Sequence, residues 1–172
     1  MSRAMRLSLS LLFAVLSIPA FAATKTPPAA SVTPKELGRF NHWIAATYPQ
    51  NGHTVCYAFT RAGSDDPATG NGPILTVTDR PDGRDQVAIS GGPSYPKDFT
   101  LPVQVGTTAL DFYTSGHDAF ARDNKAAIAA MLPASSAVAK VPGPKGGQSS
   151  LTFSLDGFTA AHDAMDKACP AH

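Results

Sequence analysis

The chain has 172 residues, of which 14 are Lys or Arg and 13 are Asp or Glu, so its formal net charge is +1. This weak balance argues against nucleic-acid binding, which rewards dense clusters of Lys and Arg, and against electrostatic docking on anionic lipid. We therefore expect no nucleic-acid partner. The length suits a single domain that buries most of its apolar surface.

Residues 1–22 have the pattern of a secretory signal peptide. Arg3 and Arg6 give a positive start, residues 7–18 are mostly apolar, and Ala20-Phe21-Ala22 forms a small-residue cleavage site. The apolar run is too short for a spanning helix, which needs ~20 apolar residues. The alternative to a signal peptide is a buried N-terminal helix. No later stretch is long and apolar enough to span a bilayer. We expect no transmembrane segment in the mature chain and a periplasmic location, with the outer surface or the medium as alternatives.

Cleavage would leave a leader followed by a domain that contains two cysteines. Residues 23–36 are proline-rich with little to bury, which predicts a flexible leader before a single domain at residues 37–172. Cys56 and Cys169 are expected to form one disulfide, because an exported chain folds in an oxidising compartment. Two buried free thiols are the alternative.

Short strands separated by close turns fill most of the domain. Asn51-Gly52 predicts a tight hairpin, because both positions tolerate a positive φ, and Gly106-Thr107 predicts another. Within the strand at 54–60, we expect Val55, Tyr57 and Phe59 to face the core and Cys56 to face a covering helix. The expected strands are residues 40–48, 54–60, 74–79, 86–90, 99–105, 108–113, 137–141 and 150–155.

Two helices complete the predicted set of elements. Residues 123–132 form a short internal helix that ends at Pro133, and residues 158–168 form a C-terminal helix that Asp156 can cap. Strands and helices do not alternate as a parallel sheet requires. The pattern therefore predicts a mainly β protein, an antiparallel β-sandwich with one short internal helix and a C-terminal helix.

The sequence contains no recognisable catalytic constellation. Nucleophile elbows, phosphate-binding glycine loops and paired Cys-x-x-Cys motifs are absent from it. His162 and Asp166 are four residues apart and could share a metal, but two unlike ligands fall short of a zinc site, and a salt-bridged helix face is the better interpretation. We predict a protein that is not an enzyme and that has no cofactor and no metal site.

An ordered set of short segments resembles a known family. The segments are Val55–Phe59, Val77–Pro81, Val87–Ile89, His117–Ala121, Phe153–Ala161 and the two cysteines. Together, over roughly residues 40–170, they are similar to the invasion-associated locus B family of exported proteobacterial proteins. The resemblance implies an immunoglobulin-like β-sandwich in the periplasm or at the cell surface, and the family's name refers to host-cell entry. It implies no catalytic residue or cofactor.

Two functions follow as expectations. The first is a non-enzymatic exported protein of the invasion-associated locus B type, which acts by binding an envelope or cell-surface macromolecule, with host-cell association as one setting. The second is a periplasmic module that binds a small molecule or a glycan through loops at one end of the sandwich. For this alternative, the exposed candidates are His117, Asp118 and Phe120.

Overall fold

The computed structural model describes residues 33–171, so the predicted signal peptide and most of the predicted leader lie outside the described residues. The mainly β architecture with an internal and a C-terminal helix is confirmed. The strands are β1 (Lys35–Phe40), β2 (Trp43–Gln50), β3 (His53–Arg61), β4 (Ile74–Arg80), β5 (Gly83–Ser90), β6 (Thr100–Val105), β7 (Thr108–Ser115), β8 (Asp118–Ala121), β9 (Ser136–Pro142) and β10 (Gln148–Ser154). The helices are α1 (Asn124–Met131), α2 (Phe158–Ala168) and a short 3-10 turn, η1 (Pro144–Gly146).

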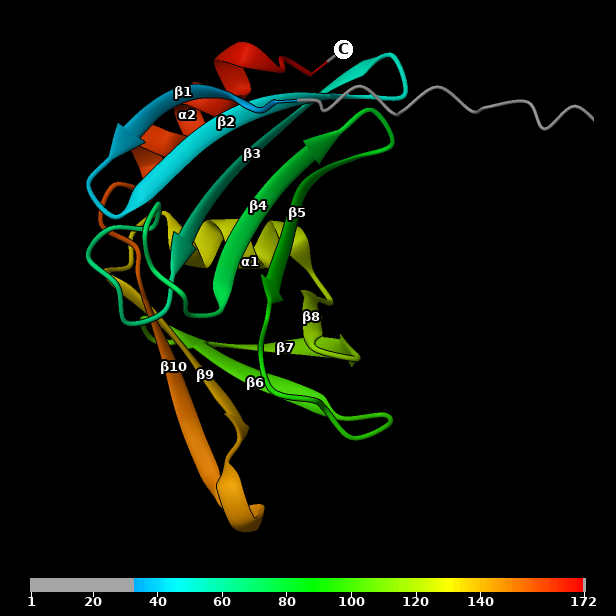
Figure 1. Cartoon of the computed structure of the whole chain (residues 1–172), viewed down its shortest axis with the longest axis vertical. Helices are drawn as coiled ribbons and strands as arrows, with labels where there is room; N and C mark the ends of the chain where they lie inside the picture. Colours follow the sequence, from blue (N-terminus) through cyan, green and yellow to red (C-terminus); the bar gives the residue numbers. More distant parts are fainter. Residues whose placement is uncertain (1–32, 172) are drawn as a thin grey trace, which may run out of the picture. The chain divides into compact units, whose positions relative to one another are not determined.

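All ten strands belong to one antiparallel sheet in the order β1-β2-β3-β4-β5-β8-β7-β6-β9-β10. The sheet turns back on itself so that β10 approaches β2 and β3 (Figure 1). The Trp43 indole Nε1 donates a hydrogen bond to the Ser154 carbonyl (3.0 Å), and the Gly63 amide donates to the Thr152 carbonyl (3.2 Å). This arrangement is consistent with the predicted β-sandwich.

The predicted tight turns set the strand register. Asn51 and Gly52 both have positive φ (52° and 81°), and they join β2 to β3 with Gln50 opposite His53. Gly106 (φ 54°) joins β6 to β7, with Val105 opposite Thr108. Both predicted hairpins are therefore confirmed.

The two helices cover one face of the sheet, which we call the covered face. α2 packs on β1, β2 and β3, whereas α1 packs on β5, β6 and β7; Figure 1 shows α2 behind β1 and β2. Small residues of the strands, such as Ala45 and Ala58, let α2 approach closely. The large buried side chains of this core include Trp43, Leu75, Phe112, Met131, Phe153, Phe158 and Met165.

The predicted side-chain directions in β3 are only half right. Cys56 faces α2 as expected, and Ala58 and Thr60 are buried beside it. Tyr57 and Phe59, however, lie half-buried on the opposite face, which we call the open face. The prediction placed the largest side chains in the core, but a closely packed helix selects small residues at the contact.

Three boundary predictions also need correction. β1 begins at Lys35, inside the predicted flexible leader, and β1 and β2 replace the single strand predicted at 40–48. β8 was not predicted as a strand. Asp156 does not cap α2, because its side chain accepts a hydrogen bond from the side-chain Nδ2 of Asn41 (3.0 Å). The N-cap of α2 is Gly157 (φ 91°), which has no side chain to cap the helix.

The predicted disulfide is present between Cys56 in β3 and Cys169 at the end of α2. Their Cα atoms are 6.2 Å apart, and the bond closes a loop with a sequence separation of 113. Cys56 is fully buried, whereas Cys169 is partly exposed. The bond therefore ties the last helix covalently to the third strand.

Reduction of the disulfide should lower the stability of the protein. The chain-entropy model gives about 4–5 kcal/mol for so long a loop, an upper figure for the measured loss. We expect a lower melting temperature with reductant and in Cys56→Ser, and we expect amide hydrogen exchange in α2 to accelerate first. The Cys56→Ser/Cys169→Ser double variant is the control and should not respond to reductant. Unchanged melting of the wild type under reduction would contradict the prediction.

The close approach of Gly157 to the turn between β1 and β2 leads to a second stability prediction. A Cβ atom at Gly157 would lie 1.9 Å from the Phe40 carbonyl oxygen, whereas one at Gly146 (φ 78°) would meet nothing within 4 Å. We expect Gly157→Ala to reduce the free energy of unfolding by at least about 3 kcal/mol. The control Gly146→Ala, with backbone strain alone, should cost about 1 kcal/mol. Equal losses in urea denaturation would refute the role of this contact.

Candidate functional site

The open face carries one cross-strand row of side chains that runs from β3 to β7. Strand pairing aligns each member opposite the next, and side chains opposite each other in a sheet share a face. Aromatic rings stand at both ends of the row, and two small side chains lie between them. We call this set the aromatic row; in strand order its members are Phe59, Thr76, Ala88, Phe120 and Tyr113.

Each end of the aromatic row is a stacked pair of rings. Phe59 stacks on Tyr57 with centroids 6.1 Å apart, and Tyr57 meets the edge of Tyr48 at 5.7 Å. Phe120 stacks on Tyr113 at 5.2 Å. Tyr113 is 46% exposed, the largest exposure among the large apolar and aromatic side chains of residues 33–171. Exposed aromatic surface of this kind is typical of binding faces.

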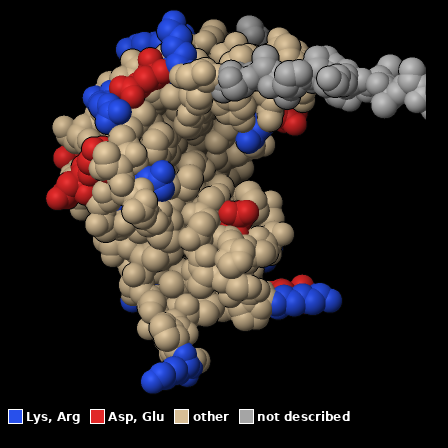
Figure 2. Space-filling view, viewed as in Figure 1, with Lys and Arg blue, Asp and Glu red and all other residues tan. Residues whose placement is uncertain are grey.

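The aromatic row itself contains no charged side chain, and the charged side chains of the open face lie beside it. Arg61 and Arg122 flank it, with guanidinium carbons 5.9 Å from the Phe59 ring and 6.0 Å from the Tyr113 ring. In Figure 2, which views the molecule as in Figure 1, most charged side chains lie around the margins of the visible face. The row therefore offers aromatic and neutral polar contacts.

The three residues predicted for a ligand loop lie on the β7–β8 hairpin and have different surroundings. His117 is exposed in the turn, where its Nδ1 lies 3.1 Å from the Gly92 carbonyl. Asp118 is half-buried at the start of β8. The pKa of Tyr95 is raised mainly by the burial of Tyr95 itself and, to a smaller extent, by the negative charge of Asp118. Only Phe120 belongs to the aromatic row. The structure thus places the predicted residues in one hairpin without directing their side chains to one cavity.

A charged cluster lies beside the disulfide. The Arg84 guanidinium donates to the Cys169 carbonyl (2.5 Å) and to Asp166 (2.6 Å), and its Nη2 lies 2.9 Å from Asp79 Oδ2. The last contact is an ion pair without hydrogen-bond geometry. Asp79 is 2% exposed, and its other oxygen accepts the Asp85 amide (2.8 Å).

His162 extends this cluster onto α2. Its Nε2 lies 2.8 Å from Asp85 Oδ1 and its Nδ1 lies 3.5 Å from Asp166 Oδ2. The interpretation of His162 and Asp166 as a salt-bridged pair therefore agrees with their positions. Among residues 33–171, no group of three or more His, Cys, Asp or Glu side chains is arranged to hold a metal ion.

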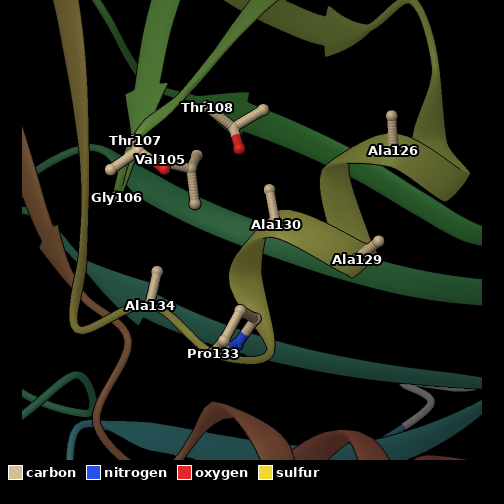
Figure 3. A pocket seen from close by; sticks show the side chains of 9 residues that line it. All are labelled: Val105, Gly106, Thr107, Thr108, Ala126, Ala129, Ala130, Pro133 and Ala134. Carbon is tan, nitrogen blue, oxygen red and sulfur yellow. The ribbon is translucent and has the colours of Figure 1, made fainter.

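Two cavities lie away from the aromatic row. One, of about 580 Å³, surrounds the disulfide end and is lined by His53, Asp79, Arg84 and Cys169 among others. The other, of about 570 Å³, lies between α1 and the β6–β7 turn, where Ala126, Ala129 and Ala130 project from the helix (Figure 3). The second has no charged lining residue, and its polar side chains are the hydroxyl groups of Thr107 and Thr108.

Most of the aromatic row and the charged cluster were not predicted. Tyr57 and Phe59 were expected to face the core, Asp79 was expected to end the strand at 74–79, and Arg84 lay between two predicted strands. The charge density of residues 79–85 was a usable signal for the cluster. The aromatic row had none, because its members come from five strands.

These observations define a class: a curled antiparallel sheet whose C-terminal helix is tied to it by a disulfide, with an aromatic row on the open face. No family model matches the sequence, and no curated protein matches it. The fold is similar to the crystal structure of invasion associated protein B from Bartonella henselae, with a TM-score of 0.59 and 16% identity over 76% of this chain and 95% of that one. The likeness establishes a shared fold. Within residues 33–171, no helix has the length and apolar character needed to cross a membrane.

Asp79 predicts a pH dependence of stability. Burial raises its pKa above the ordinary value of 3.8, against the opposing effects of the Asp85 amide and Arg84. The native state then binds this proton more tightly than the unfolded state, so its contribution to stability is present below pH 3.8 and is lost as the pH rises through the raised pKa. In urea denaturation, the stability of the wild type minus that of Asp79→Asn should fall over this range.

A matched control separates burial from the loss of any carboxylate. Asp82 is exposed in the same β4–β5 turn, so Asp82→Asn removes a carboxylate from the same loop without touching the cluster. The predicted fall should be absent when the wild type is compared with this variant. A difference between the wild type and Asp79→Asn that is constant or rises with pH would contradict the prediction.

Proposed function

We propose that this protein is an exported, non-enzymatic binding protein of the invasion-associated locus B type, which attaches to an envelope or cell-surface macromolecule through the aromatic row. The observation that carries the proposal is the pair of stacked aromatic clusters on the open face. Aromatic side chains dominate the energetics of binding faces because they bury a large area with few rotatable bonds.

Three further features support the proposal. The N-terminal sequence has the pattern of an export signal, and a disulfide suits an oxidising compartment. The fold is shared with invasion associated protein B. The rings of His117 and His162 are both engaged in contacts that hold the fold, with the Gly92 carbonyl and with two carboxylates.

The rigid placement of the aromatic row also favours a binding role. Its members stand on strands, and Phe120 pairs with Ala88 on one side and Tyr113 on the other. Side chains held on regular strands lose little conformational freedom when a partner binds, which preserves affinity.

Site-specific photo-crosslinking in the producing cells tests the proposed function. A photoreactive phenylalanine analogue at Tyr113 should give a discrete covalent adduct, because this ring is exposed at the end of the aromatic row. The control places the same analogue at Leu132, which is 42% exposed and follows α1. Adducts at both positions, or at neither, would refute the proposed use of the aromatic row.

A further inference from the structure

Resting on the function proposed above, the geometry points to a neutral saccharide chain as the occupant of the aromatic row. Such a chain presents C–H patches that pack on aromatic rings and hydroxyl groups that both donate and accept hydrogen bonds. The open face supplies both kinds of contact. Three features favour this occupant: the spacing of the rings, the polar groups of a neighbouring row and the absence of charge among the five members of the aromatic row.

The spacing leaves room between the two ring pairs. Phe59 and Phe120 lie three strand intervals apart in the sheet order, about 14 Å at ~4.8 Å per interval. Thr76 and Ala88 lie between the two rings, and both side chains project less far from the sheet than an aromatic ring does. The row therefore has an aromatic ring pair at each end and a shallow depression between them.

The row on one side of the aromatic row supplies neutral polar groups. It consists of Tyr57, Thr78 and Gln86, which lie opposite one another on β3, β4 and β5. Burial raises the pKa of Tyr57, and its phenol can donate a hydrogen bond. Thr78 adds a hydroxyl group, and Gln86 adds its amide NH2 group, because its Oε1 already accepts a hydrogen bond from Arg80.

Charge complementarity favours a neutral chain over an anionic one. None of the five members of the aromatic row is charged, and the charges beside it are of both signs: Arg61 and Arg122 lie over Phe59 and Tyr113, and Asp118 shares the face of Phe120 on β8. An anionic polymer across the row would lose hydration without gaining a buried cationic partner. An extended peptide is the competing occupant, and the experiment below distinguishes it.

The test is a titration of the full exported chain with cellohexaose, laminarihexaose and maltohexaose as neutral probes and with hexagalacturonate as an anionic probe. Chemical shifts in the amide NMR spectrum report the location of binding. We expect at least one neutral hexasaccharide to shift amides of β3, β4, β5 and β8. Tyr113→Ala should weaken the affinity by about tenfold, equivalent to ~1.4 kcal/mol. Leu132→Ala should leave it unchanged.

Phe59→Ala is a second variant at the other end of the row, and its amide spectrum verifies folding before the titration. Its affinity should fall like that of Tyr113→Ala. The inference is overturned if only hexagalacturonate binds, if no neutral probe shifts these amides, or if Leu132→Ala weakens binding equally. If the Tyr113 crosslink is found to protein while no neutral probe binds, the inference fails and the proposed function stands. If neither is observed, both fail.

Discussion

The attachment of α2 to the sheet is the constraint on which the rest of the structure depends. A covalent bond joins Cys169 to Cys56, and the Arg84 guanidinium holds the Cys169 carbonyl and Asp166 from the β4–β5 turn. The charge of Arg84 is balanced in part by the buried Asp79. Asp79 is the buried member, so removing Arg84 would be costly because it leaves a buried charge without its partner. The bond and the charged cluster therefore fix the same helix end independently.

This attachment decides which face of the sheet is free. With α2 on β1–β3 and α1 on β5–β7, the apolar residues of the covered face form the core. The open face is left to residues of opposite parity along the same strands, among them Tyr57, Phe59 and Phe120. Both the core and the aromatic row follow from one register, since a slip of one residue would exchange the faces of a strand.

The local features of the fold could be predicted from the sequence because they depend on neighbouring residues. Asn51-Gly52 and Gly106-Thr107 give hairpins through their backbone preferences alone. β1 and β8 could not be predicted in this way. Residues 35–40 show no clear alternation of apolar and polar side chains, and β8 has only four residues. β1 is therefore stabilised mainly by pairing with β2, and β8 by pairing with β5 and β7. The side of the sheet that Cys56 faces could be predicted, because its disulfide partner Cys169 ends the predicted C-terminal helix.

The candidate site could not be predicted, because its members meet only through long-range pairing. Phe59 and Tyr113 are brought into one row by five strands. Short turns join β4 to β5 and β7 to β8, but a longer loop joins β3 to β4, and β5 pairs with β8 across β6 and β7. His162 meets Asp85 across 77 residues of sequence for the same reason. Phe120 was recognised as a candidate through its place after His117 and Asp118, yet its position in the aromatic row depends on Ala88 and Tyr113. A binding face of this kind is therefore a property of the strand register, and the pairing of β5 with β8, which are distant in sequence, determines whether the rings align.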